Sequence, residues 1–170
     1  MIGSPDILQL LKGVDLFSAL NEEELEQIAS VTVKQKFCRD ETIILEKDVS
    51  FQALYIIASG EVQVYLSGVD GRETILSLMG RGDFFGEISL IDGEPRSASV
   101  RTVSDAELLI ILREDFLALL EKQPGIARGL LIEMALRLRR ANHQIGSLST
   151  MSVYGRGART ILSLVEERGV

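Results

Sequence analysis

Cysteine, histidine and tryptophan are nearly missing from this sequence, which has one, one and none of them in 170 residues. The single cysteine, Cys38, can form no disulfide within the chain and cannot supply the several thiolates of an iron–sulfur cluster. The single histidine, His143, cannot build the histidine cluster of a metalloenzyme. We therefore expect no metal site, no haem and no iron–sulfur cluster.

Long apolar runs are also lacking. No uninterrupted run approaches the roughly 20 residues that a membrane-spanning helix needs. Residues 1–11 have no basic side chain ahead of their apolar stretch, which argues against a secretory signal peptide. A composition of 46% apolar and 25% charged residues is typical of a globular chain. We expect a cytoplasmic protein with one sizeable core and no membrane partner.

Positive charge is scarce over most of the chain. Residues 1–124 contain 11 Lys and Arg against 22 Asp and Glu, whereas residues 125–170 contain 7 against 3. The acidic first part would repel a nucleic-acid backbone, while the basic tail would attract one weakly. A few arginines are more often a solvated helix face than a DNA site, which needs a denser basic patch.

Apolar periodicity predicts a helical lead-in followed by a β domain. In residues 1–30, Asn21 and Glu24 have the spacing of a capping box that starts a helix. In residues 31–123, short apolar stretches alternate with glycine turns, which is typical of an antiparallel sandwich or barrel. The expected strands are Thr42–Leu45, Ala53–Ala58, Val62–Leu66, Thr74–Leu78, Ala98–Thr102 and Leu108–Leu112.

Residues 124–153 return to a helical period. Their apolar side chains alternate in spacing between four and three residues, which is the seam of a two-stranded coiled coil. A core helix of a monomer can show this pattern, but a 3.5-residue period after a completed β domain favours a homodimer. Residues 154–170 are predicted to form a glycine hinge and the start of a further module. The predicted dimer seam contains Leu131, Met134, Leu138, Ala141, Ile145 and Leu148.

One segment in the middle of the chain has the residues of a small anion site. Gly86 lacks a Cβ, so the backbone N–H groups of Gly86, Glu87 and Ile88 could approach an anion closely. Arg96 offers a planar fork of donors suited to a phosphate, and Ser97 adds a hydroxyl. Glu87 only accepts hydrogen bonds when ionised, so it suits the hydroxyls of a sugar.

This segment resembles a known cassette. Phe-Gly-Glu-Ile-Ser-Leu, then five residues, then Arg-Ser-Ala-Ser-Val is similar to the phosphate-binding cassette of cyclic-nucleotide-binding domains. The long helix and Val-Tyr-Gly-Arg-Gly-Ala-Arg-Thr-Ile-Leu most resemble the bacterial catabolite-activator (Crp/Fnr) family of transcription regulators. The resemblance implies an antiparallel β-roll of the jelly-roll type, with an N-terminal helix and a long C-terminal dimerisation helix.

The resemblance also implies roles for individual residues. Glu87 would accept a hydrogen bond from the ribose 2′-hydroxyl. Arg96, Ser97 and the backbone amides of Gly86 to Ile88 would hold the cyclic phosphate. The expected ligand is cyclic AMP, with cyclic GMP as the alternative.

The base contact departs from the family pattern. Ala141 and Asn142 would face the base, but Ala141 stands where cyclic AMP-responsive activators commonly have a hydroxyl residue. Base recognition is therefore expected to fall to Asn142. The family's DNA-binding helix-turn-helix would begin where this sequence ends, at Val170, so DNA binding is expected only through a module absent here.

Three functions stay open at this point. The chain could be the sensor of a dimeric transcription regulator, or a regulatory module that controls a kinase, channel or other partner protein. It could also be a degenerate domain without nucleotide, held together by a Glu87–Arg96 ion pair. An enzyme is not expected, because a cupin-type barrel needs several histidines and no candidate nucleophile has a visible base partner.

Overall fold

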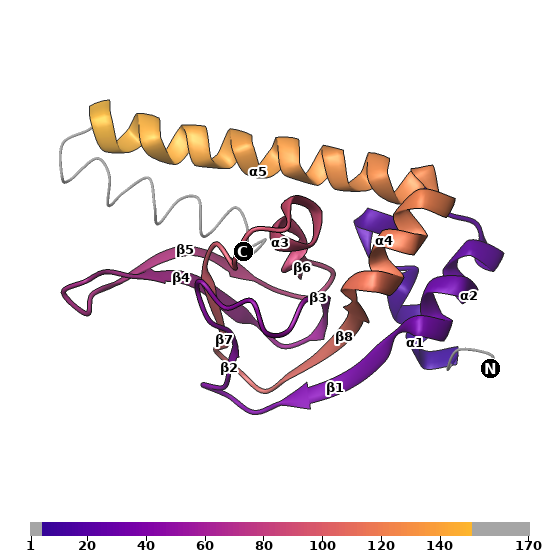
Figure 1. The fold of residues 1–170 in the computed structure, drawn as a ribbon. Helices are drawn as coiled ribbons and strands as arrows, with labels where there is room; N and C mark the ends of the chain where they lie inside the picture. The colour runs from indigo at the N-terminus through magenta and orange to yellow at the C-terminus, as the bar shows by residue number, and fades with distance from the viewer. Residues whose placement is uncertain (1–4, 151–170) are drawn as a thin grey trace, which may run out of the picture. The chain divides into compact units, whose positions relative to one another are not determined.

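A computed structural model describes residues 5–150 (Figure 1). The chain divides into two compact units, with the boundary between Gly129 and Leu130. The helices are α1 (Pro5–Leu11), the 3₁₀ helix η1 (Asp15–Phe17), α2 (Glu22–Val31), α3 (Glu87–Asp92), α4 (Arg113–Lys122) and α5 (Pro124–Thr150). The strands are β1 (Val33–Phe37), β2 (Thr42–Ile44), β3 (Ala53–Ser59), β4 (Val62–Ser67), β5 (Glu73–Met79), β6 (Phe84–Phe85), β7 (Ser99–Thr102) and β8 (Ala106–Leu112).

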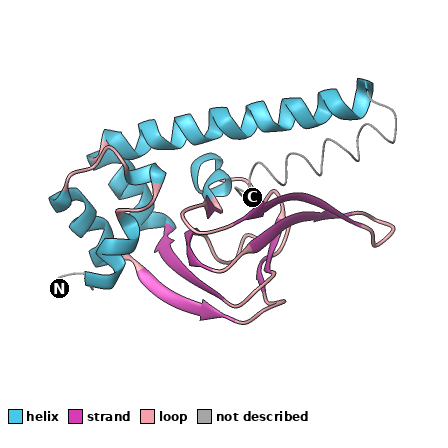
Figure 2. Cartoon of the chain, turned by 180° about the vertical axis from the view of Figure 1, so that it is seen from behind, coloured by secondary structure: helices cyan, strands magenta, loops and turns pink. Residues whose placement is uncertain are grey.

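The strands form two four-stranded antiparallel sheets of a β-roll. One sheet has the order β1-β8-β3-β6, and the other has the order β2-β7-β4-β5. In the first unit, helices α1, α2 and α4 gather at one end of the roll (Figure 2). The predicted antiparallel β-roll with an N-terminal helix and a long C-terminal helix is confirmed.

The core lies between the two sheets and follows from the period-2 alternation of strands. Ala53, Tyr55 and Ile57 of β3 point into it, and Leu108 and Ile110 of the paired strand β8 lie beside them. The alternate residues of β3 are buried as well, because α4 contacts both β3 and β8. Fully burying each leucine or isoleucine side chain of this set stabilises the fold by about 1.5–3 kcal/mol.

The capping box at the start of α2 is confirmed. Asn21 Oδ1 accepts a hydrogen bond from the Glu24 N–H at 3.0 Å, and Glu24 Oε2 accepts one from the Asn21 N–H at 2.8 Å. The six expected strands are also confirmed, with ends shifted by up to two residues. Sequence periodicity did not predict α1, β1, β6, α3 or α4, because elements this short or this dependent on their neighbours leave little periodic signal.

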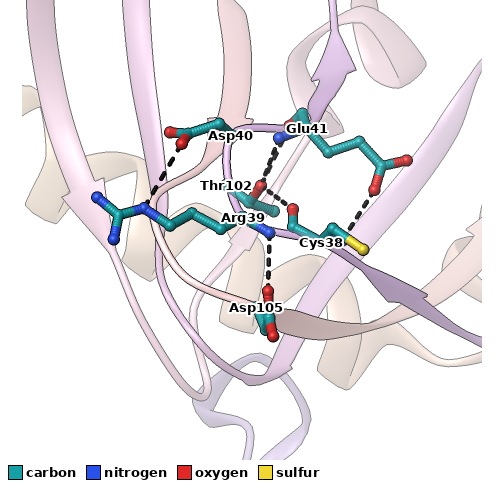
Figure 3. A network of polar contacts seen from close by, with 6 residues as sticks. All are labelled: Cys38, Arg39, Asp40, Glu41, Thr102 and Asp105. Carbon is teal, nitrogen blue, oxygen red and sulfur yellow. Dashed lines mark hydrogen bonds and ion pairs between the residues drawn. The ribbon is translucent and has the colours of Figure 1, made fainter.

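One threonine ties β7 to the turn between β1 and β2 (Figure 3). Thr102 is fully buried, and its Oγ1 accepts a hydrogen bond from the Glu41 N–H at 2.9 Å. The same hydroxyl donates to the Cys38 carbonyl at 2.6 Å. Arg39 N–H donates to Asp105 Oδ1 at 2.9 Å, so the turn is held from two places. A single buried hydroxyl therefore satisfies two backbone groups of the turn.

Replacing Thr102 with valine is expected to lower the free energy of unfolding by about 2 kcal/mol. Valine keeps the shape but leaves the N–H of Glu41 and the carbonyl of Cys38 without this partner. Thr74→Val on β5 is the control, since Thr74 is exposed, and it should change stability by less than about 0.5 kcal/mol. Urea denaturation measures both values, and equal losses in the two variants would contradict this role of Thr102.

The helix expected after Pro124 is present as α5, Pro124–Thr150. Of the predicted seam, Leu131, Leu138 and Ile145 are exposed apolar side chains. The side chain of Leu148 and the expected hinge at residues 154–170 lie outside the described residues. The dimer seam and the division at residues 30, 123 and 153 therefore stay predictions. Among the described helices, none is both long and apolar enough to cross a membrane.

Candidate functional site

The predicted anion segment folds as a strand, a short helix and a loop. Strand β6 ends at Phe85, and Gly86 follows in the left-handed conformation at φ +88° as the N-cap of α3. Helix α3 ends at Gly93, which is also left-handed at φ +75°. The short helix α3 is thus flanked by two glycines in the left-handed conformation, which is costly for residues that have a side chain.

Gly86 is required by close contacts as well as by its backbone angle. A Cβ at this position would lie 2.8 Å from the Ala53 carbonyl oxygen and 2.9 Å from Arg96 Nη1. The ring of Tyr55, which stacks on Phe85 at 5.0 Å between centroids, would lie 3.3 Å away. The absent side chain therefore lets the backbone of the segment, Arg96 and β3 meet.

Arg96 is anchored first through its backbone. Its N–H donates to the Asp48 carbonyl at 3.1 Å, and its own carbonyl accepts from the Lys47 N–H at 2.8 Å. Lys47 takes the left-handed conformation at φ +68°, which turns the chain at this point. Two hydrogen bonds thus fix the position of Arg96 against the segment that leads from β2 to β3.

The guanidinium of Arg96 points inward, and only 4% of the residue is exposed. Nη1 donates to the Gly86 carbonyl at 2.7 Å and to Ser89 Oγ at 2.8 Å. Nη2 donates to the carbonyls of Phe51 at 3.0 Å and Ala53 at 3.2 Å. These four acceptors come from two separate parts of the chain, so the arginine joins the start of α3 to the start of β3.

Electrostatics around this cation follow from its burial. Burial lowers the pKa of the Arg96 guanidinium, while Tyr55, Asp48 and Glu87 act in the opposite direction. An arginine nevertheless keeps its proton at physiological pH. Burial also raises the pKa of the Tyr55 phenol, so this neighbour is neutral at the same pH. The site therefore presents a fixed positive charge in a poorly hydrated setting, where an anion is attracted more strongly than in water.

The remaining predicted residues of the roll divide into buried and exposed ones. Glu87 opens α3 and is only 1% exposed. Ser97 follows the buried arginine and is exposed, and its hydroxyl makes no hydrogen bond within residues 5–150. The side chain of Ile88 is exposed, so only its backbone amide belongs to the predicted site. The structure thus brings Gly86, Glu87 and Arg96 together as the sequence predicts.

The predicted base contacts belong to the other unit. Ala141 and Asn142 lie on α5, and both are exposed. Their assignment to the base stays a prediction.

Sequence reasoning missed three partners of the arginine. The carbonyls of Phe51 and Ala53 precede Arg96 by 45 and 43 residues, and backbone oxygens leave no mark on a sequence. Ser89 belongs to the Phe-Gly-Glu-Ile-Ser-Leu motif itself, and a hydroxyl residue between two apolar residues of the motif is a signal that could have been noted.

In this β-roll, a short helix opens at a glycine, its first residue is a buried glutamate, and a buried arginine donates to the carbonyl of that glycine. This arrangement can hold an anion beside a hydroxyl group. The comparison with protein families agrees, because the model described as "Cyclic nucleotide-binding domain" matches residues 34–123. The chain belongs to the cyclic nucleotide-binding domain family, in the branch of the bacterial catabolite-activator (Crp/Fnr) regulators.

Curated relatives are named as a cyclic AMP receptor and as cAMP-activated transcriptional regulators. The chain is 38% identical over 157 residues to the cyclic AMP receptor protein of Thermus thermophilus, covering 92% of this chain and 72% of the relative. It is 30% identical over 161 residues to the CRP-like cAMP-activated global transcriptional regulator of Mycobacterium tuberculosis, covering 95% of this chain and 71% of the relative.

Solved structures give the same result. The Thermus thermophilus catabolite activator protein superposes with a TM-score of 0.71 at 39% identity, and the match covers 79% of this chain. This chain spans 63% of that protein, which is slightly less than two thirds. The regulatory domain of Toxoplasma gondii PKA with cAMP matches with a TM-score of 0.61 at 32% identity, over 67% of this chain and 43% of that one. The chain is accordingly a cyclic nucleotide-binding regulatory domain and not an enzyme.

Proposed function

We propose that this chain is the cyclic AMP sensor of a dimeric transcription regulator. The observation that carries the proposal is the buried guanidinium of Arg96 beside the buried carboxylate of Glu87, both next to Gly86. A cyclic phosphate needs the cation and uncapped amides, and a ribose hydroxyl needs the carboxylate. The names of the Thermus and Mycobacterium relatives include cyclic AMP, which supports this nucleotide as the ligand.

The base is the less constrained part of the ligand. We infer that Asn142 contacts it and that Ala141 faces it without a hydrogen bond, as the family resemblance implies. An asparagine side chain can both donate and accept, so it can pair with adenine or with guanine. Cyclic GMP therefore stays the alternative ligand.

Control of a DNA-binding module would pass through α5. Leu131, Leu138 and Ile145 leave an exposed apolar row on this helix at the spacing of a coiled coil. In the proposed mechanism, cyclic AMP binds more tightly to one arrangement of the paired helices and so favours that arrangement. The ligand can shift this equilibrium only by the difference between its affinities for the two states. A cytoplasmic location agrees with this proposed role.

A second candidate is a regulatory module that controls a partner protein. The match to the regulatory domain of Toxoplasma gondii PKA favours it, but that match covers 67% of this chain. The structural match to the Thermus thermophilus catabolite activator protein covers 79%. The broader coverage favours the transcription regulator.

Calorimetric titration tests the ligand. The wild-type chain is expected to bind cyclic AMP, to bind cyclic GMP less tightly, and to bind 2′-deoxy cyclic AMP about tenfold less tightly because the contact to Glu87 is lost. Glu87→Gln should weaken the binding of cyclic AMP, and it should narrow the difference in affinity between cyclic AMP and 2′-deoxy cyclic AMP. Absence of heat with every cyclic nucleotide would instead identify a degenerate domain, and unaltered affinity in Asn142→Ala would remove the assigned base contact.

Sedimentation tests the seam. Leu138→Asp places a charge on the predicted seam and is expected to give a monomer, whereas Leu136→Asp, on an exposed α5 position outside the seam, should leave the dimer intact. A monomeric wild-type chain, both with and without cyclic AMP, would contradict the proposed dimer.

A further inference from the structure

Ser89 lies inside the proposed phosphate site without being one of its expected ligand contacts. It occupies the first turn of α3 and is only 2% exposed. Its Oγ accepts a hydrogen bond from Arg96 Nη1 at 2.8 Å and lies 3.5 Å from the Gly86 carbonyl oxygen. The hydroxyl thus has one strong contact, and that contact is the arginine.

A count of donors shows what this contact does. A guanidinium has five N–H groups, two on each terminal nitrogen and one on Nε. The four terminal N–H groups match four acceptors: the carbonyls of Gly86, Phe51 and Ala53 and the hydroxyl of Ser89. Among residues 5–150, no group accepts from the Nε–H. Three of the four acceptors are backbone atoms that any sequence would supply, so Ser89 is the side chain that completes the set.

We propose that Ser89 is a positioning residue, which orients the Arg96 guanidinium so that its Nε–H edge is left for the phosphate of the nucleotide. This inference rests on the proposed function, since the phosphate belongs to the proposed ligand. Without the hydroxyl, one Nη1 N–H has no acceptor in a nearly closed site, and the guanidinium gains freedom to rotate away. Ser89 acts through the arginine and does not touch the ligand.

Nitrogen-15 NMR of the free protein tests the orientation without any nucleotide. In the wild type, the Arg96 side chain should show separate Nη signals that exchange slowly with water, assigned by their absence in Arg96→Lys. Ser89→Ala should lose the separate Nη1 signals, and Ser89→Thr, which keeps a hydroxyl, should restore them. Thr102→Val is the matched control, because it removes a buried hydroxyl elsewhere in the same roll and should leave the Arg96 signals unchanged.

Nucleotide binding supplies the second measurement. Ser89→Ala should weaken the binding of cyclic AMP about fivefold. This is the value of one hydrogen bond, and the effect is indirect because the lost hydrogen bond is made to Arg96 and not to the ligand. The affinity ratio between cyclic AMP and 2′-deoxy cyclic AMP should stay as in the wild type, because that ratio reports Glu87. The ratio between cyclic AMP and its two phosphorothioate diastereomers should change, because it reports the contact between Arg96 and the phosphate.

Unchanged Arg96 signals in Ser89→Ala would overturn the inference, as would an equal change in Thr102→Val. If the wild type binds no cyclic nucleotide, the proposed function fails while the NMR result on the free protein still decides whether Ser89 orients Arg96.

Discussion

Arg96→Ala is expected to weaken the binding of cyclic AMP at least about a hundredfold. The substitution removes a buried cation that lies next to Gly86 and Ser89 in the proposed phosphate site, where little water competes for an anion. It also leaves the carbonyls of Gly86, Phe51 and Ala53 without their donor. The free energy of unfolding should fall by about 2 kcal/mol. The loss of the Arg96 hydrogen bonds destabilises the fold, but this is partly offset because a charged group no longer has to be desolvated.

Two further variants separate charge from geometry. Arg96→Lys keeps the positive charge, but one ammonium cannot reach both the Phe51–Ala53 carbonyls and the start of α3, so only part of the affinity should return. Arg101→Ala is the control, since Arg101 lies on β7 with its guanidinium on Glu73 at 2.6–3.0 Å and over the ring of Tyr65. Calorimetry and urea denaturation give both quantities. An Arg96→Ala chain that binds within threefold of the Arg101→Ala chain would show that the proposed site is misplaced.

Gly86→Ala is expected to lower the free energy of unfolding by about 3 kcal/mol. About 1 kcal/mol comes from the left-handed backbone, which a Cβ disfavours. The rest comes from the 2.8 Å and 2.9 Å approaches of the new methyl to the Ala53 oxygen and Arg96 Nη1, which the packed site can relieve only by moving. The same movement displaces the guanidinium, so the affinity for cyclic AMP should fall more than about tenfold.

Gly93 supplies a matched control at the other end of α3. It has nearly the same backbone conformation, φ +75°, but a Cβ there would meet nothing within 4 Å. Gly93→Ala should therefore show only the backbone cost of about 1 kcal/mol and should bind cyclic AMP like the wild type. Equal stability losses in the two variants would mean that close contact at Gly86 is unimportant.

Several features of this chain could be predicted because their causes are local in sequence. The capping box needs only Asn21 and Glu24 three residues apart, and the strands need only a two-residue alternation between turns. Helix α5 has a long uninterrupted apolar period, which is the strongest kind of helical signal. Helix α3 was not predicted, since its six residues are bounded by two glycines whose left-handed angles appear only in the folded chain.

The residues of the proposed site could likewise be read from the sequence, whereas their hydrogen-bond partners could not. Gly86, Glu87, Arg96 and Ser97 stand within one short segment, and the chemistry of their side chains already indicates an anion next to a carboxylate. From the sequence, the N–H groups of the Arg96 guanidinium were expected to be free to bind a phosphate. In the structure, the two terminal nitrogens of that guanidinium donate to the protein, which leaves Nε as the donor for a ligand.

By itself, then, the sequence determined an antiparallel β domain between helical segments, because these elements depend on periodicity. The β-roll type followed from the resemblance to a known family, and the residues predicted for the anion site stand close together in the chain. Tertiary structure alone decided which way Arg96 faces. Its acceptors at Phe51 and Ala53 lie 45 and 43 residues away and are backbone oxygens, which every residue has. Only folding brings them within hydrogen-bonding distance of one buried guanidinium, with Ser89 as the side chain that completes its set of acceptors.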